Sequence, residues 1–175
     1  PDKAHEVFEM LRPLLSDSDT DNNIKIVAIK ELVVVVKVMP HHACEVFQLL
    51  KPLLKHRFEG KEEKGENESE SEEDWKVIQT AANGLSKIVK VMLPDQPREA
   101  FELLKPFLFN YHPSVIQAAT NSLVAVVNAM LPDHVYEVFE LLKSLLSDSN
   151  SDVIQAAAKG LVAVVKAMPV QAHEV

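Results

Sequence analysis

The sequence has few of the residues that build disulfide-bonded, zinc-binding or turn-rich proteins. Its 175 residues include one cysteine, four glycines, two tyrosines and one tryptophan. The single cysteine, Cys44, excludes a disulfide within the chain and a zinc finger built on cysteine ligands. Because glycine is scarce while Leu, Val and Ala are abundant, the composition favours helices over a turn-rich β-sandwich.

Positive charge is also in short supply. Lys and Arg number 18 against 26 Asp and Glu, so the formal net charge is -8 and the pI is near 5.4. Nucleic-acid binding depends on basic side chains that neutralise phosphates, and this balance argues against a nucleic-acid partner. No apolar run approaches the ~20 residues of a membrane helix. We therefore expect a cytoplasmic or nuclear protein with no membrane partner.

Four copies of one unit fill the chain. Each copy begins with a similar segment, and the four segments read "HEVFEMLRPLL", "CEVFQLLKPLL", "REAFELLKPFL" and "YEVFELLKSLL". Their phenylalanines, Phe8, Phe47, Phe101 and Phe139, lie 39, 54 and 38 residues apart. A second, more apolar segment follows each one, such as "VIQAAAKGLVAVVKAMP". Apolar residues recur at i, i+3, i+4 and i+7, which predicts two helices in every copy.

A single helical hairpin of this kind cannot bury its apolar faces, so the hairpins are expected to stack into an array. The sequence thus predicts an all-α fold in one domain, 1–175. The repeats cover roughly 1–40, 41–94, 95–132 and 133–169, as expected for a period near 40. Since "AHEV" recurs near the end, residues 170–175 are predicted to begin a fifth, truncated repeat.

The repeats resemble HEAT repeats, an armadillo-like family. Asp152 and Val153 are followed by Ala156, Ala157 and Leu161, as in that family, and the first helix carries an internal proline. In the first three repeats this proline is Pro13, Pro52 and Pro106 in turn, and Ser144 replaces it in the fourth repeat. The arginine that usually follows the Asp-Val pair is replaced by isoleucine. The resemblance implies a right-handed α-solenoid whose second helices line a concave surface.

Polar residues recur at equivalent positions of the second segments, and we call them the polar stripe. They are Lys30, Lys37, Gln79, Asn83, Lys90, Gln117, Asn121, Asn128, Gln155, Lys159 and Lys166. Within one segment they are spaced i, i+4 and i+11, which places them on one helix face. Apart from Glu31, these segments contain no acidic residue. The stripe fits either an inner ridge that binds a partner or an ordinary solvated face.

The second repeat contains an acidic insert, predicted at residues 58–74. Nine acidic residues lie between positions 59 and 74, and the run leads into Trp75. Ser69 and Ser71 each have an acidic residue three positions on, a pattern that suits an acid-directed kinase. The layout resembles the acidic loop of the importin-β family, so Ser69, Ser71 and Trp75 are candidate regulatory residues. A passive, solvated loop is the other interpretation.

Histidines raise the question of catalysis. The pair His5 and Glu6 resembles the His-Glu pairs of HEAT-type deoxyhypusine hydroxylase, but the equivalent positions hold Cys44, Arg98 and Tyr136. No set of nucleophile, base and orienting group is visible, so we expect no catalytic residue, no metal and no cofactor.

We expect a non-enzymatic scaffold that binds an acidic or extended protein segment on the polar stripe. Two alternatives remain, namely a self-assembling array that stacks end to end and a fragment of a nuclear transport receptor.

Overall fold

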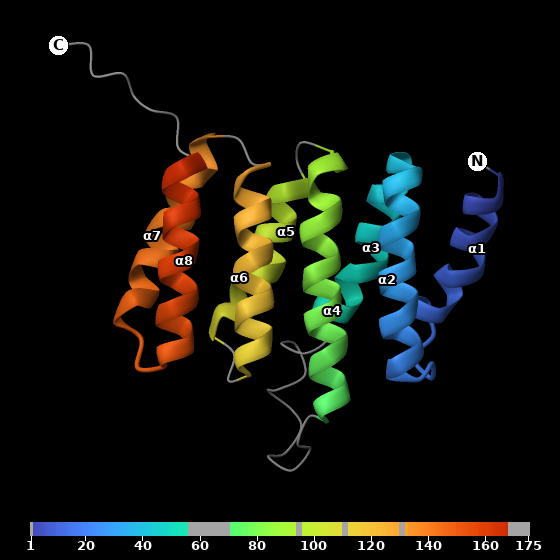
Figure 1. The fold of residues 1–175 in the computed structure, drawn as a ribbon, viewed down its shortest axis with the longest axis horizontal. Coiled ribbons are helices and arrows are strands. Elements are labelled where there is room, and N and C mark those ends of the chain that lie inside the picture. Colours follow the sequence, from blue (N-terminus) through green and yellow to red (C-terminus); the bar gives the residue numbers. More distant parts are fainter. Residues whose placement is uncertain (1, 56–70, 94–95, 110–111, 130–131, 168–175) are drawn as a thin grey trace.

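The computed structural model describes residues 2–55, 71–93, 96–109, 112–129 and 132–167 (Figure 1). In these ranges the chain forms α-helices α1 Asp2–Ser16, α2 Asn22–Val38, α3 Ala43–Lys55, α4 Glu72–Ile88, α5 Gln96–Leu104, α6 Pro113–Val127, α7 Pro132–Ser144 and α8 Ser151–Ala167. Short 3-10 helices are η1 Pro40–His42, η2 Val89–Val91, η3 Lys105–Phe109 and η4 Leu145–Ser147. The predicted all-α class is confirmed. Residues 170–175, assigned to a fifth repeat, lie outside the described residues.

The helices pack in sequence order. Each odd-numbered helix packs against the even-numbered helix that follows it, and α2, α4, α6 and α8 also contact one another in turn. Figure 1 shows these four second helices side by side and parallel, with α3 and α5 behind them. The α1–α2 and α7–α8 pairs form the two ends of the row. Within the described ranges, no helix combines the length and the hydropathy that a membrane crossing requires.

The core runs the length of the row, between the first and the second helices. Phe8, Phe47 and Phe101 are fully buried at the same position of α1, α3 and α5, whereas Phe139 of α7 is only partly buried. Alanine and β-branched residues of the second helices complete the core, because small side chains let neighbouring helices approach closely. The repeated phenylalanine therefore marks one buried position per hairpin.

The prolines of the first helices do not all behave alike. Pro13 and Pro52 lie inside α1 and α3, as predicted. The prediction is wrong for Pro106, because α5 ends at Leu104 and the chain continues as η3. Proline donates no backbone hydrogen bond and disfavours the α conformation in the residue before it, so it ends this shorter helix.

The second helix of the acidic repeat begins earlier than predicted. The insert was expected to reach residue 74, but α4 starts at Glu72, so residues 72–74 are helical. Ser71 and Asp74 form a capping box. The Ser71 Oγ accepts from the Asp74 backbone N–H at 3.3 Å, while the Ser71 N–H donates to Asp74 Oδ2 at 3.1 Å. These bonds satisfy backbone donors that would otherwise be unpaired at the helix start.

The capping box yields a stability prediction. We expect Ser71→Ala to lower the free energy of unfolding by about 1 kcal/mol, because the first turn of α4 loses a hydrogen-bond acceptor. Urea denaturation followed by circular dichroism measures the change. Glu73→Gln in the same exposed turn is the control, and an equal effect of the two substitutions would contradict the capping role.

Candidate functional site

The polar stripe lies on the surface of the second-helix layer. All of its residues are exposed or half-buried, and the half-buried ones are Gln79, Asn83 and Gln117. Lys90 lies in η2, just beyond the end of α4, and is exposed there. The structure thus brings the predicted positions together on four helices that pack side by side (Figure 1).

The stripe has three rows that run across the helices. The first row consists of Gln79, Gln117 and Gln155; the second of Lys30, Asn83, Asn121 and Lys159; the third of Lys37, Lys90, Asn128 and Lys166. Along a helix the second row lies about 6 Å from the first, and the third about 10 Å further on. With helix axes about 8–10 Å apart, each full row spans roughly 30 Å across the layer.

The stripe offers more hydrogen-bond donors than acceptors. Gln117 Nε2 donates to Asn121 Oδ1 at 3.0 Å, and Lys159 Nζ donates to Gln155 Oε1 at 3.4 Å. Asn128 Nδ2 donates to the Val124 carbonyl at 2.9 Å. These bonds use three donors and two side-chain acceptors of the stripe. Five of its eleven residues are lysines, which can only donate, so its surface suits a partner that presents acceptor oxygens.

Two of the second helices, α4 and α8, carry opposite charges at their two ends. Acidic residues occupy the first turns of α4 and α8, whereas Lys37, Lys87 and Lys166 occupy last turns. Glu31 is therefore not the only acidic residue of the second helices, because α4 and α8 begin before the segments that the sequence predicted. Both charge positions complement the helix dipole. The lysine row thus lies at the carboxyl ends of these helices.

One lysine at the acidic end is engaged locally. Lys76 Nζ lies 3.0 Å from Glu72 Oε1. This hydrogen bond and the lysine charge lower the pKa of the exposed Glu72 carboxyl. Lys76 therefore adds little to the positive charge available to a partner.

The candidate regulatory residues have structural contacts. Ser71 caps α4, and Trp75 is half-buried against the core. The Trp75 ring stacks on His112, with centroids 5.6 Å apart and planes inclined by 23°. Because His112 precedes α6, this contact joins two neighbouring second helices. Ser69 lies outside the described residues.

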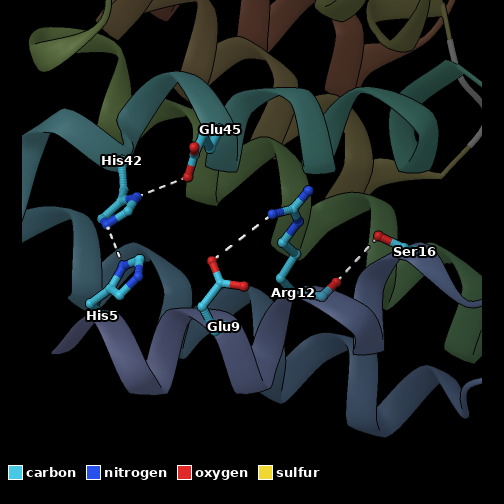
Figure 2. A network of polar contacts seen from close by, with 6 residues as sticks. All are labelled: His5, Glu9, Arg12, Ser16, His42 and Glu45. Atoms are coloured by element: carbon cyan, nitrogen blue, oxygen red, sulfur yellow. Dashed lines mark hydrogen bonds and ion pairs between the residues drawn. The ribbon is translucent and has the colours of Figure 1, made fainter. Parts of the chain in front are cut away.

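A histidine network joins the first two hairpins (Figure 2). His42 is buried, and its ring stacks on Phe8 with centroids 4.3 Å apart. His42 Nδ1 donates to Glu45 Oε2 at 2.9 Å, and His42 Nε2 lies 3.4 Å from His5 Nδ1. The sequence comparison placed His5 and Cys44 at the same position of two repeats. It did not predict that His42 contacts His5, because this contact joins different repeats.

Two further polar contacts lie along α1, near the histidines. Arg12 Nη1 lies 3.9 Å from Glu9 Oε1, and Ser16 Oγ donates to the Arg12 carbonyl at 3.3 Å (Figure 2).

Among the described residues, no group of three or more His, Cys, Asp and Glu side chains is arranged to hold a metal ion.

A small cleft opens at the acidic end of the second helices. Its volume is about 350 Å³, and it lies between the α1–α2 turn, the end of α3 and the start of α4. Asn22 Nδ2 donates to Asp74 Oδ1 at 2.9 Å in its wall, and Lys25 donates to the Ser18 carbonyl at 3.0 Å. The Asn22–Asp74 bond joins the first two hairpins, whereas the Lys25–Ser18 bond lies within the first hairpin.

Comparison with known proteins supports the fold alone. No protein-family model matches the sequence. No curated protein matches it significantly. The chain is similar to two crystal structures of engineered proteins from the Northeast Structural Genomics Consortium. One has a TM-score of 0.62 and 22% identity over 91% of this chain and 64% of that chain. The other has a TM-score of 0.53 and 18% identity over 92% of this chain and 66% of that chain.

This chain therefore spans a little less than two thirds of the length of either engineered protein. The similarity shows the all-helical fold. The HEAT and importin-β resemblances stay predictions.

Proposed function

We propose that this chain is a non-enzymatic protein-binding scaffold, a right-handed α-solenoid of four HEAT-like hairpins that binds an acidic, extended segment on its polar stripe. The observation that carries this proposal is the register of the stripe. Exposed or half-buried Lys, Asn and Gln side chains recur at equivalent positions of three or four of the second helices, which pack in order. An isolated solvated face would not need the same residue types on every helix.

The spacing of the stripe suits an extended segment that crosses the helices. Neighbouring helix axes lie about 8–10 Å apart, and a chain in the extended polyproline II conformation rises about 3.1 Å per residue with three residues per turn, so that side chains i and i+3 point the same way. Every third residue of such a segment would therefore meet the next helix. Lys37, Lys90 and Lys166 supply positive charge in one row, and Asn128 supplies an amide on the helix between the last two. A partner with acidic residues at every third position fits this row best.

The affinity of such a surface is expected to be modest and salt-sensitive. Exposed ion pairs contribute about 0–1 kcal/mol each, and salt screens them over a Debye length of about 8 Å at physiological ionic strength. Binding would thus depend on several rows acting together, with amide groups adding hydrogen bonds to backbone carbonyls.

The acidic insert is proposed to compete with the partner. It joins Lys55 at the end of α3 to Ser71 at the start of α4. The start of α4 lies at the opposite end of the second helices from the lysine row. The fifteen residues between them can reach out and back by at most about 27 Å. Asn83 lies about 18 Å along the helix from Ser71, and Lys90 about 29 Å, so the insert is proposed to compete for the first two rows and not for the lysine row.

Charge reversal tests the stripe. We expect Lys37→Glu/Lys90→Glu to weaken binding of a fluorescein-labelled oligo-glutamate peptide roughly tenfold or more, since two attractive charges become repulsive. Fluorescence anisotropy at low and physiological salt measures the dissociation constant. The matched control is Lys55→Glu/Lys76→Glu, which changes the net charge equally outside the stripe. Equal weakening by both variants would show that only the net charge matters, and the proposed site would be wrong.

Shortening the insert tests the competition. Residues 58–70 are replaced by Ser-Asp-Ser, as found between α7 and α8, so that Ser71 and Asp74 still cap α4. We expect the peptide to bind about two- to fivefold more tightly, the range for exposed charges worth up to ~1 kcal/mol. An unchanged dissociation constant with unchanged salt dependence would identify the insert as a passive loop.

A further inference from the structure

The α7–α8 end of the row exposes a surface that is buried between hairpins elsewhere. Val162 and Val165 of α8 are 57% and 56% exposed. The equivalent residues of α2, Val33 and Val36, are 4% and 2% exposed. Val33 faces α4, since a Cβ added at Gly84 would lie 3.2 Å from its Cγ2. The exposed face of α8 is thus one half of the contact that packs the second helices together.

The α1–α2 end exposes the other half of the same contact. Ile24 and Val27 of α2 are exposed, whereas Val115 and Ala118 at the equivalent positions of α6 are buried. The first helices show the same pattern, because Val7 of α1 is exposed and its counterpart Val46 in α3 is fully buried. Both ends therefore present apolar surfaces that match each other in the register of the internal repeats.

Charges at the two ends are complementary in that register. Lys51 of α3 forms an ion pair with Glu99 of α5, across the boundary between the second and third hairpins. The equivalent lysine at the α7–α8 end is Lys143, and the equivalent glutamate at the α1–α2 end is Glu6. Both are exposed, and Lys143 Nζ also lies 3.4 Å from Glu140 Oε2 on its own helix. Stacking one end on the other would bring these two side chains together.

We propose that a second copy of this chain docks head to tail, with the α7–α8 face of one copy against the α1–α2 face of the next. The contact repeats the packing that already joins the internal hairpins, and it adds an ion pair between Lys143 and Glu6. Because the two faces differ, the contact is heterologous and each copy keeps one free end. Open chains of copies form, and the polar stripe stays exposed along them.

Glu31 limits the affinity of this contact. The second helices of the other repeats carry Gly84, Ser122 and Gly160 at its position, and these small residues lie in the buried contact between helices. In the docked pair the Glu31 side chain faces Val162, where it must bend aside or lose water. Substitution by serine, the residue of the third repeat, therefore strengthens the contact.

Sedimentation velocity of the full 175-residue chain, from micromolar to millimolar concentration, tests the proposal. The expected result is a mass that rises with concentration beyond that of a dimer. Glu31→Ser lowers the dissociation constant, and Val162→Asp abolishes association. Lys143→Glu weakens association roughly tenfold, and adding Glu6→Lys restores it, as for a directly paired charge. Lys55→Glu, on α3 in the middle of the row, is the matched control and leaves association unchanged.

Any of the following results would overturn the proposal. The first is that the wild type and Glu31→Ser both remain monomeric up to millimolar concentration. The second is that association survives Val162→Asp. The third is that Glu6→Lys fails to restore the Lys143→Glu variant, or that association stops at a dimer. Circular dichroism of each variant confirms that its helix content equals that of the wild type.

Discussion

The structure depends on close packing between successive second helices. A helix such as α4 is apolar on several sides, so it is buried only when α2, α3 and α6 all contact it. Small residues set how near these helices come. Ser122 Oγ, for example, lies 2.6 Å from the Ala82 carbonyl oxygen of α4 and 2.7 Å from the Ala118 carbonyl oxygen of its own helix, and its single proton serves these two acceptors. Since each hairpin covers its neighbour, stability is shared along the row rather than held by any one unit.

This packing also organises the surface. Consecutive second helices are parallel (Figure 1). A residue type that recurs at one position of the repeat therefore forms a row across them, and three such rows of Lys, Asn and Gln residues make up the polar stripe. The same repetition determines the two ends. Wherever the row stops, the surface that packs between hairpins is left exposed, so valines buried in α2 have exposed counterparts in α8. The proposed partner site and the proposed contact between copies thus follow from one geometry and lie on different faces.

The helical hairpins and the surface position of the polar stripe were predictable from the sequence, because both recur in every repeat. The phenylalanine spacing indicated one hairpin per period, and the polar stripe indicated which side chains reach solvent. Features that depend on local chemistry or on contacts between repeats were not predictable. The capping box of Ser71 and Asp74 starts α4 at Glu72, so the first turn of the helix contains Glu72, Glu73 and Asp74. Pro106 ends its helix whereas Pro52 does not. His42 meets His5 from another hairpin, a contact that no periodicity within one repeat could reveal.

Small residues in the second helices allow the hairpins to stack, and the Gly84→Leu substitution tests this most directly. A Cβ at Gly84 would lie 3.2 Å from Val33 Cγ2 and 3.3 Å from Ile29 Cγ2, so a leucine must force α2 and α4 apart. Urea denaturation should show a loss of about 1–3 kcal/mol in the free energy of unfolding, although leucine favours a helix more than glycine does. Lys87→Leu, exposed on the same helix, should have little effect. A Gly84→Leu variant as stable as the wild type would contradict the account.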